Sequence, residues 1–460
     1  MTKLFNDEGA SGRAITELSC EMMIKTGRAL ALTLLKKSGR KPKILIGRDT
    51  RISSEILTAA LSAGCCSAGA DSVVLGVIPT PAVSCLCTKY SADAGVMISA
   101  EHNSFEYNGI KLFGPDGGII DSGLLEEIDS LTLSKNAETQ CRGGEDIGSI
   151  KSEERAEWDY VRSLLKRIET DLKSLRVVID CANGAAYLCA EKFFRGLGAT
   201  VTLINNKPDG KNINAGSGAF EPESMIQAVL SSRAHVGISL DGDGGRCVMA
   251  DEKGNLLKGD SITAIISKNM KQEGRLPSNG CVISPTMNLA FSSWAKEQGI
   301  VITTAPEVGI KQLSKRMREY GYKLGGSESG HVIVGGRVAD GMLAGALVLE
   351  IMAKTHMKLS ELAKDYTPYE SFAVNLRLRR EYCGRWADVP ALKEMIEYCQ
   401  TKLEGNGRIL VREAATSPIL RILAEGRDRE LVWQYASAIK RTAIDYVGEE
   451  DTEETQDENS

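Results

Sequence analysis

Apolar, beta-branched runs alternate with helical stretches along most of this chain, and this alternation is the feature that most constrains its fold. The first round predicts a strand at 41–50, a helix at 53–69 and a further strand at 71–83. Such a rhythm predicts a mostly parallel sheet with right-handed crossovers, because a right-twisted strand packs the following helix onto its sheet only in that hand. We therefore expect an α/β fold.

The same rhythm restarts at 175–245 and again at 280–331. Segments 98–120 and 238–257 share one order of parts: a strand, a loop with acids and glycines, a second strand, and a glycine turn into a third strand. Segment 325–341 echoes this order weakly. We predict three similar mixed-sheet α/β domains, each with a loop at the carboxyl ends of its strands, where open α/β sheets bind ligands.

After about residue 366 the pattern changes to a strand at 370–380, a helix near 388–404, an apolar segment at 407–426 and a helix at 429–446. This order predicts a smaller C-terminal α+β domain, so that four domains surround a central cleft. The last residues are acidic and lack core-forming side chains, which predicts a disordered tail. The expected boundaries are 1–155, 156–255, 256–366 and 367–447 for the domains, and 448–460 for the tail.

Composition excludes several classes of protein. The chain has 460 residues and a net charge of −5, which argues against nucleic acid as a main partner. It has no apolar run long enough to span a bilayer, and its first residues lack the apolar core of a signal peptide, so we expect a cytoplasmic protein. The 12 cysteines follow neither zinc-ligand nor redox spacing, and we expect them to be reduced and mostly buried.

Eight short motifs occur in the order and at the spacing found in one enzyme family. They are "GRDTR" (47–51), "PTPAV" (79–83), "NGIKLF" (108–113), "DCANGAAY" (180–187), "PDGKNIN" (208–214), "DGDG" (241–244), "SGH" (329–331) and "GNGRILVR" (405–412). On these motifs the chain resembles the α-D-phosphohexomutases over nearly its whole length. The fourth and fifth motifs favour the amino-sugar branch of that family, the phosphoglucosamine mutases.

The resemblance implies an intramolecular phosphotransfer that interconverts glucosamine-6-phosphate and glucosamine-1-phosphate. In the family, a phosphoserine on the first-domain loop gives its phosphoryl group to the sugar phosphate, and the bisphosphate returns its other phosphate to the serine. A magnesium ion, held by three aspartates and a phosphoserine oxygen, neutralises the developing charge. A Glu-x-Ser-Gly-His loop binds sugar hydroxyls, and an Arg-x-Ser-Gly-Thr-Glu-Pro loop holds the phosphate that does not react.

The chain departs from this pattern in six loops, and each departure removes a group that the family's chemistry uses. The replacements are Glu101 for the phosphoserine, Gly245 for the third metal aspartate, Ser327 for the sugar-loop glutamate, Ala414, Ala415 and Ser417 in the phosphate loop, Ser11 for an N-terminal arginine, and "VGIK" (308–311) for Val-Gly-Asp-Arg. The strands and glycine turns keep their pattern. We interpret the chain as a retained scaffold with impaired chemistry.

The candidate site residues follow from the motif positions. We expect Glu101 to replace the phosphoserine with about one negative charge instead of about two. The candidates are Glu101, His102 and Lys111 at the catalytic positions; Glu101, Asp241 and Asp243 for a weakly bound or absent Mg²⁺; and Arg246, Ser329, His331, Arg412, Thr416 and Arg421 for the substrate. The alternatives are a solvated loop acid at Glu101, a plain glycine turn at 241–244, and ordinary surface or packing roles for the others.

Three kinds of function remain open. The favoured one is a pseudoenzyme that binds a sugar phosphate or regulates another protein, with mutase activity impaired or lost. The second is an active phosphosugar mutase with altered chemistry, in which Glu101 forms an acyl phosphate, because carboxylate nucleophiles exist. The third is a scaffold. The expected partners are a phosphosugar and either a second copy, through the outer helices of the first domain, or another cytoplasmic enzyme.

Overall fold

The computed structural model describes residues 4–6, 9–134, 141–413 and 418–449. The chain forms two compact units, described separately here: the first holds 1–287 and 297–366, and the second holds 288–296 and 367–460. Among the described residues, the first unit contains three mixed sheets and the second an antiparallel sheet. The predicted class, three mixed-sheet α/β domains plus a smaller C-terminal domain, is confirmed.

The first sheet has the strand order β1-β5-β4-β2-β3-β6, in which β5 is antiparallel to both of its neighbours, β1 and β4, and the other neighbouring strands are parallel. Its strands are β1 (Ala10–Arg13), β2 (Lys43–Arg48), β3 (Asp71–Val77), β4 (Ala94–Ile98), β5 (Tyr107–Phe113) and β6 (Ile150–Ser152). The chain moves one way along the sheet from β2 to β3 and back from β3 to β4. Right-handed crossovers therefore place the two connecting helices on opposite faces.

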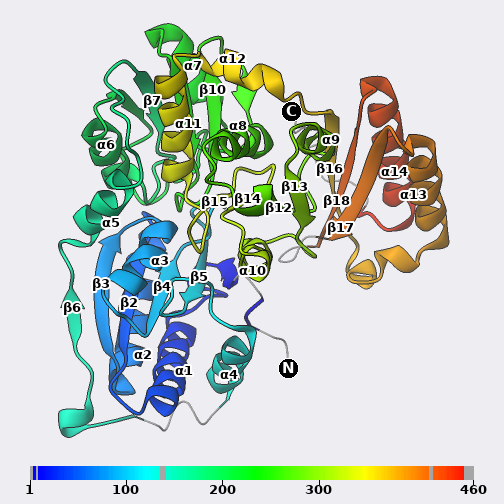
Figure 1. The fold of residues 1–460 in the computed structure, drawn as a ribbon. Helices are drawn as coiled ribbons and strands as arrows, with labels where there is room; N and C mark the ends of the chain where they lie inside the picture. Colours follow the sequence, from blue (N-terminus) through cyan, green and yellow to red (C-terminus); the bar gives the residue numbers. More distant parts are fainter. Residues whose placement is uncertain (1–3, 7–8, 135–140, 414–417, 450–460) are drawn as a thin grey trace. The chain divides into compact units, whose positions relative to one another are not determined.

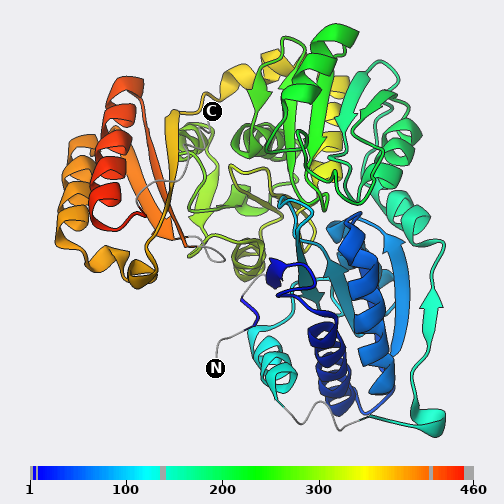
Figure 2. The same cartoon turned by 180° about the vertical axis from the view of Figure 1, so that it is seen from behind.

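The helices of this first part are α1 (Cys20–Ser38), α2 (Ile52–Ser67), α3 (Thr80–Lys89) and α4 (Ser122–Leu133). Figure 2 shows α1 and α2 side by side over one face of the sheet, and Figure 1 shows α3 on the other. Glycines permit the α1–α2 contact, because a Cβ at Gly64 would lie 2.2 Å from the carbonyl oxygen of Ile24.

The strand predicted at 71–83 was too long, since β3 ends at Val77 and α3 begins at Thr80. The extended Pro79 precedes this helix, and Pro81 lies in its first turn, where a missing N–H costs nothing. The apolar side chains of 80–83 therefore belong to a buried helix start.

The second sheet has the order β11-β10-β9-β7-β8, and the third has the order β13-β12-β14-β15. Their strands are β7 (Arg176–Asp180), β8 (Thr200–Ile204), β9 (Val236–Leu240), β10 (Cys247–Asp251), β11 (Leu256–Leu257), β12 (Gly280–Ile283), β13 (Val301–Thr304), β14 (Leu324–Gly326) and β15 (Val332–Val334). The helices around them are α5 (Ala156–Leu165), α6 (Tyr187–Gly196), α7 (Glu223–Ser232), α8 (Gly259–Gln272), α10 (Ile310–Tyr320), α11 (Gly341–Thr355) and α12 (Leu359–Leu362).

The three sheets share one arrangement at the point where the site forms. In each, a strand with a parallel neighbour on one side runs into a loop, and the chain returns on its other side as an antiparallel strand: β4 to β5, β9 to β10, and β14 to β15. The strands β4, β9 and β14, which precede these loops, are buried along their length, as expected of strands covered on both faces. The weak repeat in the sequence therefore corresponds to a repeated strand–loop–strand structure.

The second unit is a smaller α+β structure with the strand order β16-β18-β17. It contains α9 (Ala290–Glu297, except its last residue), β16 (Glu370–Arg377), α13 (Pro390–Leu403), β17 (Gly407–Glu413), β18 (Ile419–Gly426) and α14 (Arg429–Tyr446). Leu392, Ile422 and Val432 belong to its apolar core. The predicted tail lies outside the described residues from 450 onward. No helix in the described part of the chain is long and apolar enough to cross a membrane.

Candidate functional site

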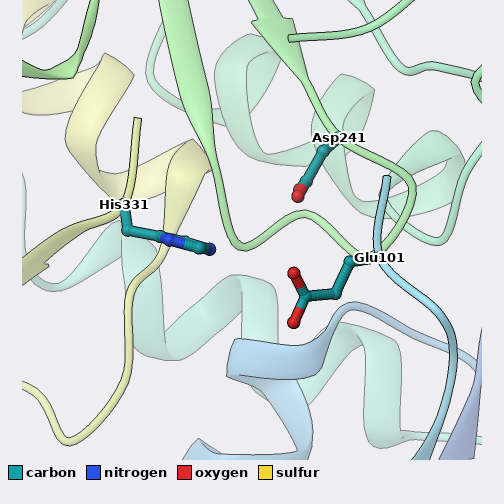
Figure 3. A group of neighbouring side chains, drawn as sticks. All are labelled: Glu101, Asp241 and His331. Carbon is teal, nitrogen blue, oxygen red and sulfur yellow. The ribbon is translucent and has the colours of Figure 1, made fainter. Parts of the chain in front are cut away.

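The loops that follow β4, β9 and β14 bring predicted site residues together within the first unit. Glu101 comes from the first loop, Asp241 from the second and His331 from the third. Figure 3 shows the three side chains directed toward one another, and one ligand-type atom from each lies within 4.8 Å of the others. Residues that are up to 230 positions apart in sequence therefore form one cluster.

The backbone at Glu101 has an unusual conformation. Its φ of 53° is left-handed, which a residue with a Cβ adopts only when its surroundings impose it. Its N–H donates to Ser99 Oγ at 3.1 Å, and its carbonyl oxygen accepts from Asn214 Nδ2 at 2.9 Å and from Arg51 at 3.3 Å. Gly242 lies against the same oxygen, and a Cβ there would be 2.5 Å away. The first and second domains thus fix this loop jointly.

Two cations hold the carboxylate of Glu101. One oxygen forms an ion pair with Lys111 Nζ, and Oε2 accepts from Arg246 at 2.9 Å. Burial disfavours the charged form, but Lys111 and Arg246 outweigh it and keep the pKa of Glu101 well below its usual range. Glu101 is therefore a fixed, ionised carboxylate, and the solvated loop acid that the sequence left open is not what the structure contains.

Asp243 lies on the other side of Lys111. Its Oδ2 accepts from Thr80 Oγ1 at 2.6 Å and from Lys111 Nζ at 3.1 Å, and its Oδ1 accepts from the N–H of Gly245 at 3.0 Å. Although Asp243 is buried, the Lys111 ammonium and these donors lower the pKa of its carboxyl. Both of its oxygens are occupied by protein donors.

Asp241 is the least satisfied acid of the cluster. It is fully buried, and its Oδ1 accepts from the backbone N–H of Arg246 at 3.0 Å. Its Oδ2 has no hydrogen-bond partner among the described residues, although Arg246 Nε is 3.8 Å away. Burial and the charge of Asp243 raise the pKa of Asp241 to about 7.

Arg246 connects the cluster. Its Nε donates to His331 Nε2 at 3.0 Å, one terminal nitrogen contacts His102 Nδ1 at 2.7 Å, and the other binds Glu101. Burial and the nearby guanidinium hold the pKa of His331 well below its usual range. His331 is therefore a neutral imidazole whose Nε2 accepts a hydrogen bond from Arg246. The loop of His331 also holds Ser329, whose hydroxyl lies 3.1 Å from that of Ser327.

Phe220 lies at the site, although the sequence did not predict it as a site residue. Its ring stacks on His102 with centroids 4.6 Å apart, the Arg246 guanidinium lies 4.9 Å from the ring centre, and the residue is 54% exposed. No motif marked Phe220. By contrast, Thr80 and Asn214 lie within motifs that had been used only to recognise the family.

The predicted phosphate-loop residues lie in the second unit or outside the described residues. Arg412 on β17 and Arg421 on β18 are directly opposite each other, and neither has an acidic partner in the part of the chain that the structure describes. Burial and the charge of Arg421 lower the pKa of Arg412. The remaining positions, Ala414, Ala415, Thr416 and Ser417, fall outside the described residues, as do positions 7 and 8 of "NDEGASG".

The cluster fits an all-oxygen magnesium site poorly. Mg²⁺ requires near-octahedral oxygen donors, but Asp243, one of the three expected ligands, has both oxygens hydrogen-bonded within the protein. The group that could hold an ion is instead Glu101, Asp241 and His331, which includes an imidazole nitrogen. Such a mixed set suits divalent transition metals better than magnesium.

The chain matches four family models that together span most of its length. They are phosphoglucomutase/phosphomannomutase alpha/beta/alpha domain I at residues 2–139, domain II at 158–254, domain III at 258–369 and the C-terminal domain at 374–442. The chain is 39% identical over 450 residues to the phosphoglucosamine mutase of Acetivibrio thermocellus, covering 97% of this chain and 100% of that one. It is 39% identical over 444 residues to that of Clostridium novyi, covering 96% and 98%.

Solved structures show the same fold. A phosphoglucomutase/phosphomannomutase family protein from Burkholderia thailandensis has a TM-score of 0.78 at 21% identity, covering 96% of this chain and 97% of that one. The Aspergillus fumigatus N-acetylphosphoglucosamine mutase, in complex with GlcNAc-6P and magnesium, has a TM-score of 0.61 at 18% identity, covering 80% and 92%. From the family models and the curated relatives, the chain belongs to the phosphoglucomutase/phosphomannomutase family, the α-D-phosphohexomutases, and resembles its phosphoglucosamine mutases.

Proposed function

We propose that this chain binds a phosphosugar, that its mutase turnover is impaired or lost, and that it acts through binding, as a sensor or as a regulatory partner of another enzyme. The observation that carries the proposal is the state of Glu101 at the phosphoserine position. One of its oxygens is paired with Lys111 and the other with Arg246.

This arrangement supports binding without transfer. The family reaction that the resemblance implies needs a phosphoryl group on the loop side chain, and a carboxylate does not carry one as a stable ester. To attack a phosphorus atom, a Glu101 oxygen would have to share its electron density with the cation that already holds it, and this pairing lowers its nucleophilicity. The low pKa of Glu101 also makes its carboxylate a weak nucleophile. Glu101 is better suited to supply the charge of the missing phosphoserine than its chemistry.

The ligand class is supported by groups outside Glu101. Ser329 and His331 remain from the sugar-binding loop, and His331 contacts Arg246. In the second unit, the facing pair Arg412 and Arg421 suits a phosphate, because guanidinium groups bind phosphate oxygens through paired N–H donors. The Aspergillus fumigatus relative was solved with GlcNAc-6P. A hexosamine phosphate is therefore the first ligand to test.

The alternative, an active mutase with an acyl phosphate on Glu101, draws on one observation. The carboxylate is ionised and lies on the loop that carries the family's nucleophile, with Lys111 beside it to neutralise charge. The binding proposal and this alternative predict opposite outcomes for covalent labelling.

The deciding experiment combines calorimetry, turnover and mass. Under the binding proposal, glucosamine-6-phosphate binds, a coupled assay with a sugar-1,6-bisphosphate activator gives no turnover, and the intact mass is unchanged after incubation with the bisphosphate. Turnover together with a one-phosphoryl adduct on Glu101 that hydroxylamine releases would establish the alternative. Absence of binding by any hexose or hexosamine phosphate at millimolar concentration would refute both proposals.

A further inference from the structure

We infer that the guanidinium of Arg246 is a resident cation at the metal position formed by Glu101, Asp241 and His331, so that this cluster is complete without a divalent ion. The inference goes beyond the proposed function, since it holds whether or not the chain turns over a sugar phosphate.

The distances place Arg246 among all three candidate ligands. Its terminal nitrogen is 2.9 Å from Glu101 Oε2, and its Nε is 3.0 Å from His331 Nε2 and 3.8 Å from Asp241 Oδ2. A metal ion bound to His331 Nε2 at about 2 Å could lie no more than about 5 Å from Arg246 Nε. Two cations would then share one buried site at a separation where their repulsion is strong.

Arg246 is also fixed in this position. Its backbone N–H donates to Asp241 Oδ1 at 3.0 Å, its guanidinium contacts His102 at 2.7 Å and lies over the ring of Phe220, and the residue is only 8% exposed. Moving it aside for an ion would break contacts with several neighbours at once. A guanidinium also cannot lose its proton in a protein, so this cation is permanent.

The charge of the cluster leads to the same conclusion. In the family pattern, three aspartates and a phosphoserine bring about five negative charges, which a divalent ion helps to balance. Here the third aspartate is Gly245 and the phosphoserine is Glu101, which leaves the three carboxylates of Glu101, Asp241 and Asp243. Lys111 pairs with Glu101 and Asp243, and Arg246 pairs with Glu101 and Asp241. Lys111 lies in the family motif "NGIKLF" and Arg246 also matches a family position, so the chain keeps both cations while the site has lost about two negative charges, and less charge is left for a divalent ion to balance.

Binding of Mn²⁺, measured by electron paramagnetic resonance and calorimetry, tests the inference without any activity readout. Wild type and the Arg246→Lys control, which keeps a cation, should bind no Mn²⁺ below about 1 mM. Arg246→Ala should open the cluster and bind Mn²⁺ at least about tenfold more tightly, and adding Asp241→Asn to it should remove the gain.

Two results would overturn the inference. One is tight Mn²⁺ or Mg²⁺ binding by the wild-type protein that Asp241→Asn abolishes. The other is a folded Arg246→Ala variant that still binds no ion. If Arg246→Ala does not fold, the wild type decides the matter alone: its melting temperature should be the same in EDTA and in millimolar Mg²⁺ or Mn²⁺, and a rise that Asp241→Asn removes would refute the resident cation.

Discussion

Lys111 Nζ lies between two carboxylates that are largely shielded from water: it forms an ion pair with Glu101 on the loop after β4 and lies 3.1 Å from Asp243 Oδ2 on the loop after β9. One ammonium group thus joins loops from two different sheets. Because the side chains of Glu101 and Asp243 are only 14% and 2% exposed, this contact differs from an exposed ion pair, whose contribution to stability is small.

Lys111→Met should therefore destabilise the folded chain by about 3–5 kcal/mol, because it leaves two negative charges close together with less compensation. Urea unfolding measures the loss, and Lys111→Arg, which keeps the charge, should recover much of it. A loss below about 1 kcal/mol for Lys111→Met would mean that the carboxylates are solvated or otherwise neutralised.

Glu101→Ser alone should not restore mutase turnover. The metal loop has Gly245 and the sugar loop has Ser327 in place of family carboxylates, and groups that act as a unit do not recover one at a time. A coupled assay with glucosamine-6-phosphate and a bisphosphate activator measures the rate. Turnover by this single variant within about tenfold of a typical kcat of roughly 10 per second would contradict the expectation.

Much of this site could be predicted from sequence, because its residues follow strands whose apolar pattern is clear. Motif positions marked Glu101, Asp241 and His331, and the strand pattern placed each of them on a loop at the carboxyl end of a strand, where open α/β sheets bind ligands. The three loops belong to three different sheets, so their meeting depends on how the sheets pack. The sequence could not predict that Arg246 contacts Glu101, His102 and His331 together, since a side chain's direction depends on tertiary packing. Phe220 could not be found either, since an exposed loop aromatic has no periodic signal.

Stability should depend on pH through Asp260, away from this cluster. Burial raises the pKa of Asp260 to about 6, although Tyr366 donates to its Oδ2 at 2.9 Å. A carboxyl whose pKa is raised in the folded state makes its full contribution to stability below its unfolded pKa of about 3.9. This contribution is lost as pH rises through the folded pKa of about 6. Asp260→Asn should therefore remove a decline of about 2 kcal/mol between pH 4 and pH 7.

Urea unfolding across this pH range checks the Asp260 prediction, with the exposed Asp445→Asn as the matched control. The control should keep the wild-type pH profile. An unchanged profile in Asp260→Asn would mean that this carboxyl does not titrate with a raised pKa in the folded protein.

Arg412→Ala should weaken binding of both inorganic phosphate and a hexosamine phosphate by about 1.5–3 kcal/mol, roughly tenfold to a hundredfold, because a charged hydrogen bond to phosphate would be lost. In the wild type, Arg412 lies opposite Arg421, so two like charges are adjacent. Because Arg412→Ala removes this repulsion, the variant should be no less stable than wild type. Calorimetry gives the affinity, and the exposed Arg385→Ala should behave as wild type. Equal affinities in Arg412→Ala and wild type would show that this strand pair does not hold the phosphate.

Phe220→Ala should weaken binding of a hexosamine phosphate without changing binding of inorganic phosphate. The half-exposed ring stacks on His102 and lies against Arg246, so it offers an apolar surface for the face of a sugar ring beside the charged cluster. Covering such a surface contributes roughly 1 kcal/mol, so the expected loss of affinity is about fivefold to tenfold.

The Phe220→Trp variant should keep the affinity, and its indole fluorescence should change when the sugar phosphate binds. If Phe220→Ala weakens the sugar phosphate and inorganic phosphate equally, the ring acts only by holding Arg246 in place. If neither affinity changes, the sugar does not lie against Phe220.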